Sequence, residues 1–270
     1  MTAPPISIIV STYNWPHALR LSLKSLMNQC DKGYEIIVAD DGSGPETAEL
    51  IAKLSEASPV DIRHVWQEDV GFRKSIILNA AIAEAHGAYL IFVDGDCIAQ
   101  PDFVTQYRRL ARPNCLVTGS RIMLGKALSE ALLQEEELNF ARFRSRAPTY
   151  RLRNEVSKLL PLFLRGPDSR LRNYRRFAWR RIKGCNLACW RKDAQRAGGF
   201  DEQLTGWGHE DADFVLRLYE IGIVRRSGAW STEVLHLWHP EADRDRAETN
   251  RRIVSERIAA AEKRRPHGGT

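Results

Sequence analysis

The chain of 270 residues lacks the features that mark membrane-spanning and secreted proteins. No run of about 18 apolar residues occurs, so we expect no transmembrane helix. The N-terminus, Met1 to Pro5, has no basic region followed by an apolar core, so we expect no secretory signal. Five cysteines, odd in number and scattered, indicate free thiols in a reducing compartment. The sequence therefore predicts a cytoplasmic protein.

Common metal-binding and nucleotide-binding motifs are missing too. Cys185 and Cys189 lie four residues apart, but no second pair follows at zinc-ligand spacing, so we expect no zinc site there. No Gly-x-Gly-x-x-Gly follows the first predicted strand, and no Walker-type lysine loop occurs. These absences disfavour the usual dinucleotide fold and the usual phosphate-binding loop.

Apolar strand-like segments alternate with amphipathic helix-like segments in the first third of the chain. The predicted strands are 6–10, 34–39, 61–66 and 89–93, and the predicted helices are 16–27, 47–57 and 75–85. This order predicts an α/β fold with a Rossmann-like, mostly parallel central sheet flanked by helices. In open sheets of this kind, ligands bind beyond the carboxyl ends of the strands.

Polar side chains follow three of these predicted strands. They are Ser11 to Asn14, Asp40 to Ser43, and the pair Asp94 and Asp96. Two carboxylates at the end of a buried strand repel each other and are costly to desolvate unless a cation meets them. Asp94 and Asp96 are therefore either a divalent-cation site facing a phosphate or a plain Asp-Gly surface turn. The convergence of three polar clusters at one sheet edge favours a ligand site.

The middle of the chain is strongly basic. A strand is predicted within 114–123 and a charged helix at 129–143, and residues 142–183 carry twelve Arg and two Lys against two acids. This basic stretch also contains the apolar patch 159–164. It is interpreted as a solvated helical excursion, as a surface for an anionic membrane or anionic acceptor, or as a nucleic-acid site. We expect a helical basic insertion over about 125–183.

Two later motifs carry side chains suited to catalysis and binding. Glu210 and Asp211 begin a predicted helix, where acids are also common because they suit the helix dipole. Trp207 lies between two glycines, which indicates an exposed aromatic platform for a sugar. His236 and His239 lie three apart in a late predicted strand, and one of them is a candidate metal ligand.

Together these motifs resemble those of the family 2 inverting glycosyltransferases, which have a GT-A fold. The shared motifs are Ile-Ser-Ile-Ile-Val-Ser-Thr-Tyr-Asn from Ile6, Val-Ala-Asp-Asp-Gly-Ser from Val38, Val-Asp-Gly-Asp from Val93 and Gly-Trp-Gly-His-Glu-Asp from Gly206. From the last motif through His-Leu-Trp-His-Pro, the chain is similar to the galactosyltransferase-like and chondroitin-polymerase-like branch. The resemblance covers about 5–120 and 183–240, and the basic stretch between them has no counterpart.

The resemblance implies roles for individual residues. The donor nucleotide would contact Ser11, Thr12, Tyr13, Asn14, Asp41, Arg73 and Asp94, with Lys74 also near the donor. Mn²⁺ or Mg²⁺ would be held by Asp94, Asp96 and His236, with His239 as the rival of His236. Asp211 would be the general base, and Glu210 would help to hold the acceptor. The acceptor sugar would contact Trp207, Gly206 and Asn186.

The predicted organisation is a single GT-A domain over 1–240, followed by a helix and tail at 241–270. Within the domain we expect a nucleotide-binding half at 1–120 and an acceptor-side half at 184–240, on either side of the basic insertion. The terminal helix is predicted at 241–265.

The resemblance implies a metal-dependent transferase that moves a sugar from a nucleotide-diphosphate sugar, UDP-linked, to a hydroxyl of a glycan or glycolipid. One displacement would invert the anomeric centre and form a β-glycosidic bond. We expect an acceptor that is anionic or membrane-anchored, contact of 142–183 with the inner face of the cytoplasmic membrane, and no nucleic-acid partner. The rival hypotheses are a metal-dependent nucleotidyl- or phosphotransferase and an anion- or nucleic-acid-binding module. His209 stands where related motifs often have glycine, so acceptor identity does not carry over.

Overall fold

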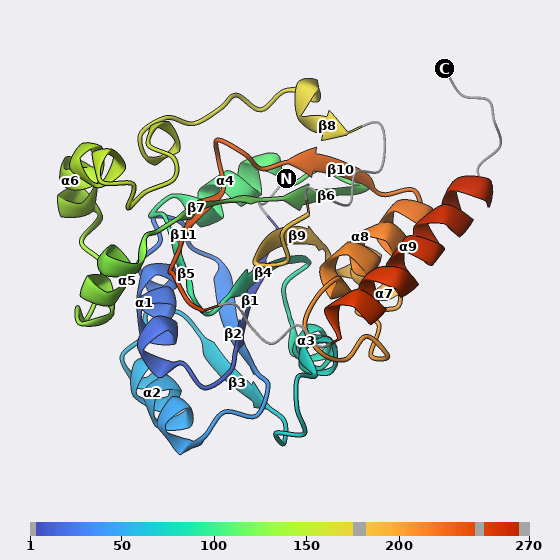
Figure 1. Cartoon of the computed structure of the whole chain (residues 1–270), viewed down its shortest axis with the longest axis horizontal. Coiled ribbons are helices and arrows are strands. Elements are labelled where there is room, and N and C mark those ends of the chain that lie inside the picture. The colour runs from blue at the N-terminus through green and yellow to red at the C-terminus, as the bar shows by residue number, and fades with distance from the viewer. Residues whose placement is uncertain (1–3, 175–181, 241–245, 265–270) are drawn as a thin grey trace.

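The computed structural model describes residues 4–174, 182–240 and 246–264. In these ranges, eight strands form a central sheet in the order β3-β2-β1-β4-β9-β6-β10-β8 (Figure 1). They are β1 Ile6–Thr12, β2 Tyr34–Asp40, β3 Ile62–Trp66, β4 Tyr89–Asp94, β6 Cys115–Thr118, β8 Asn173–Tyr174, β9 Asn186–Trp190 and β10 Val224–Ser227. The first four run parallel, and β9 lies antiparallel between β4 and β6. The predicted mostly parallel α/β sheet is confirmed.

The central strands are buried on both faces, as their continuous apolar sequences require. In β1, Ile8 and Ile9 contact different core clusters on opposite faces, and neither is exposed. The helices on the Ile8 face are α1 Pro16–Met27, α2 Pro45–Glu56 and α4 Phe103–Leu110. Those on the Ile9 face are α3 Lys74–Glu84, α7 Arg191–Arg196 and α8 Glu210–Glu220. Helix α9, Ala247–Arg264, packs outside α8 (Figure 1).

A second sheet of three strands brings a late segment beside the paired aspartates. Its order is β5-β11-β7, with β5 at Cys97–Ala99, β11 at Glu233–His236 and β7 at Ser120–Met123. Helices α5, Lys126–Leu133, and α6, Phe140–Leu152, share its apolar cluster. The strand register pairs His236 with Cys97, the residue that follows Asp96. A histidine from the end of the chain is thus held next to a carboxylate from its first half.

The prediction of one charged helix over 129–143 is wrong, because the structure has two helices there with a break between them. Helix α5 ends at Leu133 and α6 begins only after Asn139, whose side chain accepts a hydrogen bond from the backbone N–H of Arg142 at 3.0 Å. Three consecutive glutamates, 135–137, follow α5, where negative charge opposes the helix dipole. The sequence therefore contains a stop signal and a start signal within one charged run.

Two further regions differ in detail from the sequence prediction. The strand predicted within 114–123 is divided at Gly119 into β6 and β7, which belong to different sheets. After α6, the described part of the basic insertion has only two single turns of 3₁₀ helix and the short strand β8, so it is less helical than predicted. Residues 175–181 of that insertion, and 241–245 and 265 of the predicted terminal helix, lie outside the described residues. In the ranges that are described, no helix has the length and apolar character needed to cross a membrane.

Candidate active site

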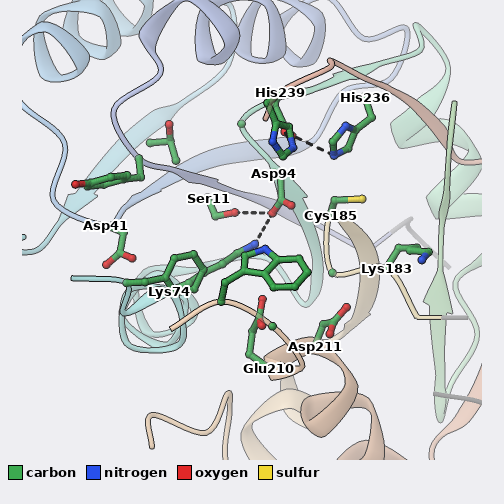
Figure 2. A pocket seen from close by; sticks show the side chains of 18 of the residues that line it. Ser11, Asp41, Lys74, Asp94, Lys183, Cys185, Glu210, Asp211, His236 and His239 are labelled. Carbon is green, nitrogen blue, oxygen red and sulfur yellow. Dashed lines mark hydrogen bonds and ion pairs between the residues drawn. The ribbon is translucent and has the colours of Figure 1, made fainter. Parts of the chain in front are cut away.

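A cavity of about 790 Å³ lies at the carboxyl ends of β1 and β4. Its walls come from the ends of these strands and of β2, the start of α3, strand β7, the segment before β9, the loop leading into α8, and the end of β11 with the residues that follow it. Figure 2 shows Glu210 and Asp211 on one side, His236 and His239 on the other, and Lys74 and Asp94 between them. The fold therefore brings three of the predicted motifs around one space.

Asp94 is held by protein groups on the floor of this cavity. Its Oδ1 atom accepts hydrogen bonds from Ser11 Oγ at 2.8 Å and from Lys74 Nζ at 2.5 Å (Figure 2). Burial alone would raise the pKa of Asp94, but the Lys74 ammonium outweighs it and the pKa is lowered. Asp94 is therefore ionised and already has a cationic partner.

The polar groups after β1 and β2 form the cavity wall beside Asp94. Ser11 and Thr12 line it, as does the exposed ring of Tyr13, whose hydroxyl donates to Asp69 at 2.8 Å. Asp41 is buried there; its Oδ2 accepts from the backbone N–H of Arg73 at 2.9 Å, and burial raises its pKa. An exposed aromatic ring beside a carboxylate suits a planar nucleobase that carries a ring N–H.

Two predicted donor residues do not line the cavity. Asn14 faces the turn after β2, where its side-chain oxygen accepts from the backbone N–H of Gly44 at 2.9 Å. The guanidinium of Arg73 donates to the backbone carbonyl of Glu68, so Arg73 meets this site through its backbone N–H to Asp41. Asn14 and Arg73 therefore support other residues by hydrogen bonds and do not contact the cavity themselves.

Asp96 and both candidate histidines form one group of potential metal ligands. Their ligand atoms lie within 4.8 Å of one another, with Asp96 Oδ2 at 3.6 Å from His236 Nε2 and 3.3 Å from His239 Nε2. Each histidine has its Nδ1 near a backbone carbonyl, at 2.9 Å for His236 and 2.7 Å for His239. A proton on Nδ1 satisfies that carbonyl and leaves the Nε2 lone pair directed at Asp96.

This donor set of one carboxylate and two imidazole nitrogens, converging with lone pairs, fits a first-row divalent cation such as Mn²⁺ better than Mg²⁺, which prefers oxygen ligands. Burial, and then the charge of Asp94, raise the pKa of Asp96, although the two histidines oppose them. A bound cation would offset both effects, because its positive charge favours the ionised form of Asp96. The structure thus keeps both His236 and His239 as candidates, whereas Asp94 is absent from the three-ligand group and contacts Lys74 instead.

Glu210 and Asp211 occupy the opposite wall at the first turn of α8. Glu210 is buried, and its Oε2 has no hydrogen-bond partner in the described part of the chain. Burial, and then the charge of Asp211, raise the pKa of Glu210 to about 7, although Lys74 opposes them. Asp211 is more accessible, and its Oδ1 accepts from the backbone N–H of Ala212 at 2.7 Å. Asp211 can therefore act as a proton acceptor, and Glu210 has an oxygen that is available to form a hydrogen bond.

The three predicted acceptor contacts have different places in the structure. Trp207 is 40% exposed and lines the cavity, whereas Gly206 does not line it and donates its backbone N–H to the carbonyl of Phe72 at 3.1 Å. Asn186 is fully buried and does not reach the cavity.

The side chain of Asn186 instead joins the two sheets, so its predicted acceptor contact is corrected to a structural role. It accepts from the hydroxyl of Tyr107 and donates to the backbone carbonyls of Ser120 and Thr232. Gly119 lies against this side chain, where a Cβ atom would collide with it.

Among the cavity residues that were not assigned to the site from the sequence are two basic side chains, Arg121 and Lys183, and the thiol of Cys185. Arg121 projects from β7 and contacts Cys185 Sγ at 3.7 Å. Both basic residues line the same cavity as the predicted catalytic acids but precede them in the sequence by 27 residues or more. The pairing of β7 with β11 brings Arg121 here, and the pairing of β9 with β4 and β6 brings Lys183 and Cys185, which precede β9; no local pattern marks either pairing.

Comparison with solved structures defines the class of fold. A mannosyltransferase from Pyrobaculum calidifontis in complex with GDP-Man and Mn²⁺ superposes with a TM-score of 0.60 at 18% identity, covering 100% of this chain and 66% of that one. Residues 1–349 of Staphylococcus aureus TarS in complex with UDP-GlcNAc give a TM-score of 0.59 at 14% identity, covering 94% and 66%. The chain therefore has a GT-A fold, as predicted.

Comparison of sequences identifies the family. The model for glycosyl transferase family 2 matches residues 7–171, more than half of the chain, and that for the N-terminal domain of galactosyltransferase matches residues 170–239. The chain belongs to glycosyl transferase family 2.

Named relatives within the family are longer than this chain. Chondroitin synthase of Escherichia coli is 30% identical over 91% of this chain and 36% of its own length. Hyaluronan synthase of Pasteurella multocida is 29% identical over 80% of this chain and 23% of its own length. A validoxylamine A glucosyltransferase of Streptomyces hygroscopicus is 27% identical over 86% and 52%. The chain thus spans roughly a quarter to a half of these relatives.

Proposed function

We propose that this protein transfers a sugar from a nucleotide-diphosphate sugar, UDP-linked, to a hydroxyl group of a glycan or glycolipid. The observation that carries the proposal is the pairing, across one cavity, of a carboxylate–imidazole group with two acids at a helix start. The membership of family 2 supports the reaction class. Solved GT-A structures with GDP-Man and with UDP-GlcNAc support a nucleotide-sugar donor.

The donor would lie along the ends of β1, β2 and β4. The ring of Tyr13 stacks on the base, and the buried Asp41 carboxylate accepts from the ring N–H. Asp96, His236 and His239 would hold Mn²⁺ or Mg²⁺, which when bound offsets the negative charge of the leaving diphosphate. Asp94 stays paired with Lys74, whose ammonium adds positive charge on the same side.

The acceptor would lie against the other wall. Trp207 forms an apolar floor for the sugar ring, and Glu210, whose Oε2 has unused hydrogen-bonding capacity, holds an acceptor hydroxyl. Asp211 removes the proton from the attacking hydroxyl. Because attack comes from the side opposite the leaving group, the anomeric centre is inverted, and an α-linked donor gives a β-linked product.

Replacement of the base tests this assignment. In Asp211→Asn, transfer should fall by at least roughly 1,000-fold, because the amide cannot accept the proton, while metal-dependent UDP binding changes less than about threefold. Asp61→Asn is the matched control, since Asp61 is exposed and outside the cavity. Product release by the wild type is measured with UDP-sugars and Mn²⁺. Near wild-type turnover in Asp211→Asn would refute the role of Asp211, and release of pyrophosphate in place of UDP would favour the nucleotidyltransferase rival.

The basic surface supports a second element of the proposal, an anionic membrane as the location of the acceptor. Exposed arginines at 142, 146, 151, 153 and 170 share the segment with exposed leucines and a phenylalanine at 152, 160, 163, 164 and 171. Figure 1 shows α6 and the chain up to β8 along one edge of the molecule. Arginines with apolar anchors are typical of binding at the interface of anionic lipids.

Vesicle sedimentation tests this surface. The wild type should bind vesicles that contain anionic lipid at low salt and should release at high salt, with no binding to neutral vesicles. Arg142→Ala combined with Phe163→Ser should weaken binding at least roughly tenfold, because it removes charge and anchor together. Lys53→Ala combined with Arg252→Ala removes two exposed cations elsewhere and should have little effect. Equal loss in both double variants would mean that net charge alone drives binding.

A further inference from the structure

Two buried cysteines form a second group of potential metal ligands beside the carboxylate–imidazole group. One ligand atom from each of Cys97, Cys185 and His236 lies within 4.8 Å of the other two. The three residues are 0%, 3% and 4% exposed. The sequence spacing paired Cys185 with Cys189, but the fold pairs it with Cys97, which is remote in sequence. Figure 2 shows Cys185 close to His236, on the same wall of the pocket.

The three segments that carry these ligands are fixed by backbone hydrogen bonds. His236 and Cys97 are register partners across β11 and β5. The carbonyl of Cys185 accepts from the backbone N–H of Asp94 at 3.3 Å, and the carbonyl of Asp96 accepts from that of Leu237 at 3.0 Å. Ligands held on paired strands need little reordering when an ion binds.

We propose that Cys97, Cys185 and His236 bind a thiophilic divalent cation of the Zn²⁺ class. Two thiolates and one imidazole are a ligand set that tetrahedral Zn²⁺ prefers over the oxygen-rich sets of Mg²⁺ or Mn²⁺. Zn–S and Zn–N bonds of about 2.3 and 2.0 Å place ligand atoms about 3.5 Å apart, so atoms already within 4.8 Å need only small rotations. The guanidinium of Arg121 donates to Cys185 Sγ at 3.7 Å.

Asp96 completes this site and links it to the first one. Its Oδ1 lies 3.5 Å from Cys97 Sγ, which suits the fourth position of a tetrahedral ion. Of the two ligand groups, only His236 belongs to both, with Asp96 and His239 in the first and the cysteines in the second; on the proposal, Asp96 would join the second group as its fourth ligand. One cation must exclude the other. On the proposed function, Zn²⁺ is then an inhibitor that displaces the ion needed for transfer.

Titration with Cd²⁺ tests the thiol site independently of catalysis. Reduced protein free of Mn²⁺ should show a thiolate-to-metal charge-transfer absorption that saturates at one equivalent of Cd²⁺. Cys97→Ser and Cys185→Ser should lose it, whereas Cys189→Ser, another buried cysteine, should keep it. His239→Ala should also keep it. Cys185→Ala should also lose the absorption. If this variant still binds UDP in a Mn²⁺-dependent manner, the loss comes from the missing ligand and not from misfolding.

Inhibition kinetics tests the link between the two sites. Zn²⁺ should inhibit the Mn²⁺-loaded wild type, and its inhibition constant should rise at least roughly tenfold in Cys185→Ser. No absorption in the wild type, or absorption that survives both serine variants, would overturn the thiol site. Equal Zn²⁺ inhibition in wild type and Cys185→Ser would show that Zn²⁺ acts at Asp96 and the histidines alone. An absorbing wild type that transfers no sugar would instead count against the proposed function, and the thiol site would stand.

Discussion

Glu210 is a buried acid at the cavity wall, and its ionisation should cost folding stability. Its pKa is about 7 in the folded chain against 4.5 for an ordinary glutamate, because it is buried and lies beside Asp211. The unfolded chain therefore releases this proton at a lower pH than the folded chain does. Folding loses stability as pH rises from about 4.5 to about 7, and the loss is complete above that window.

Glu210→Gln removes this loss, because glutamine has nearly the same shape and cannot ionise. A shift of about 2.5 pKa units corresponds to about 3 kcal/mol. The variant should thus be more stable than the wild type by about 3 kcal/mol at pH 8 and by almost nothing near pH 4.5. For a chain of this size, that is an increase of Tm of about 8 °C at pH 8.

Urea denaturation of both proteins from pH 4.5 to 8, without metal or nucleotide, measures the difference. Glu256→Gln, an exposed glutamate on α9, is the control and should give a nearly constant difference across this range. In an Asp211→Asn background the gain from Glu210→Gln should shrink, since the second cause of the raised pKa is gone. Parallel pH profiles for wild type and Glu210→Gln would refute the reasoning.

Two further predictions concern the metal group and the core. His236→Ala should weaken Mn²⁺ binding roughly 100-fold and His239→Ala roughly tenfold, because the side chain of His236 is buried whereas that of His239 is 39% exposed. Titration calorimetry measures both affinities. Equal losses of affinity in the two variants would contradict this ranking. Asn186→Ala should destabilise the chain by about 4 kcal/mol, because it leaves the hydroxyl of Tyr107 and two buried carbonyls unpaired. A stable Asn186→Ala protein with impaired acceptor binding would return Asn186 to the role first predicted from sequence.

The parts of the fold that sequence predicts well are those with a local pattern. Strands β1, β2 and β4 are continuous apolar runs that end in polar groups, and α1 and α8 have amphipathic spacing. Their order alone implies that Ser11, Asp41 and Asp94 share one sheet edge, and all three line the cavity. Polar residues that follow the strands of a parallel sheet lie together, because the carboxyl ends of those strands meet at one edge. The sequence of each strand end therefore suffices to predict the site.

The parts that sequence does not predict depend on pairing between remote segments. Strand β9 lies between β4 and β6 although it is far from both in sequence, and this insertion carries Cys185 to the cavity while burying Asn186. Cys185 lies in the turn before β9 and lines the cavity, whereas Asn186, the first residue of β9, donates to the backbone carbonyls of Ser120 and Thr232 away from it. Nothing in the composition of 184–190 says which neighbour faces the cavity, since that depends on the strands on either side.

The two aspartates of the Val-Asp-Gly-Asp motif differ in a way that the sequence leaves open. Asp94 ends β4 beside the start of α3, so Lys74 reaches it and lowers its pKa against the effect of burial. Asp96, two residues on, faces the imidazole of His236 at the end of β11 and that of His239 beyond it; burial, and then the charge of Asp94, raise its pKa although both imidazoles oppose them. A cation entering the cavity therefore meets one carboxylate already neutralised and one still lacking a counter-charge. That asymmetry follows from Coulomb's law and from where α3 begins, and it directs a metal to Asp96.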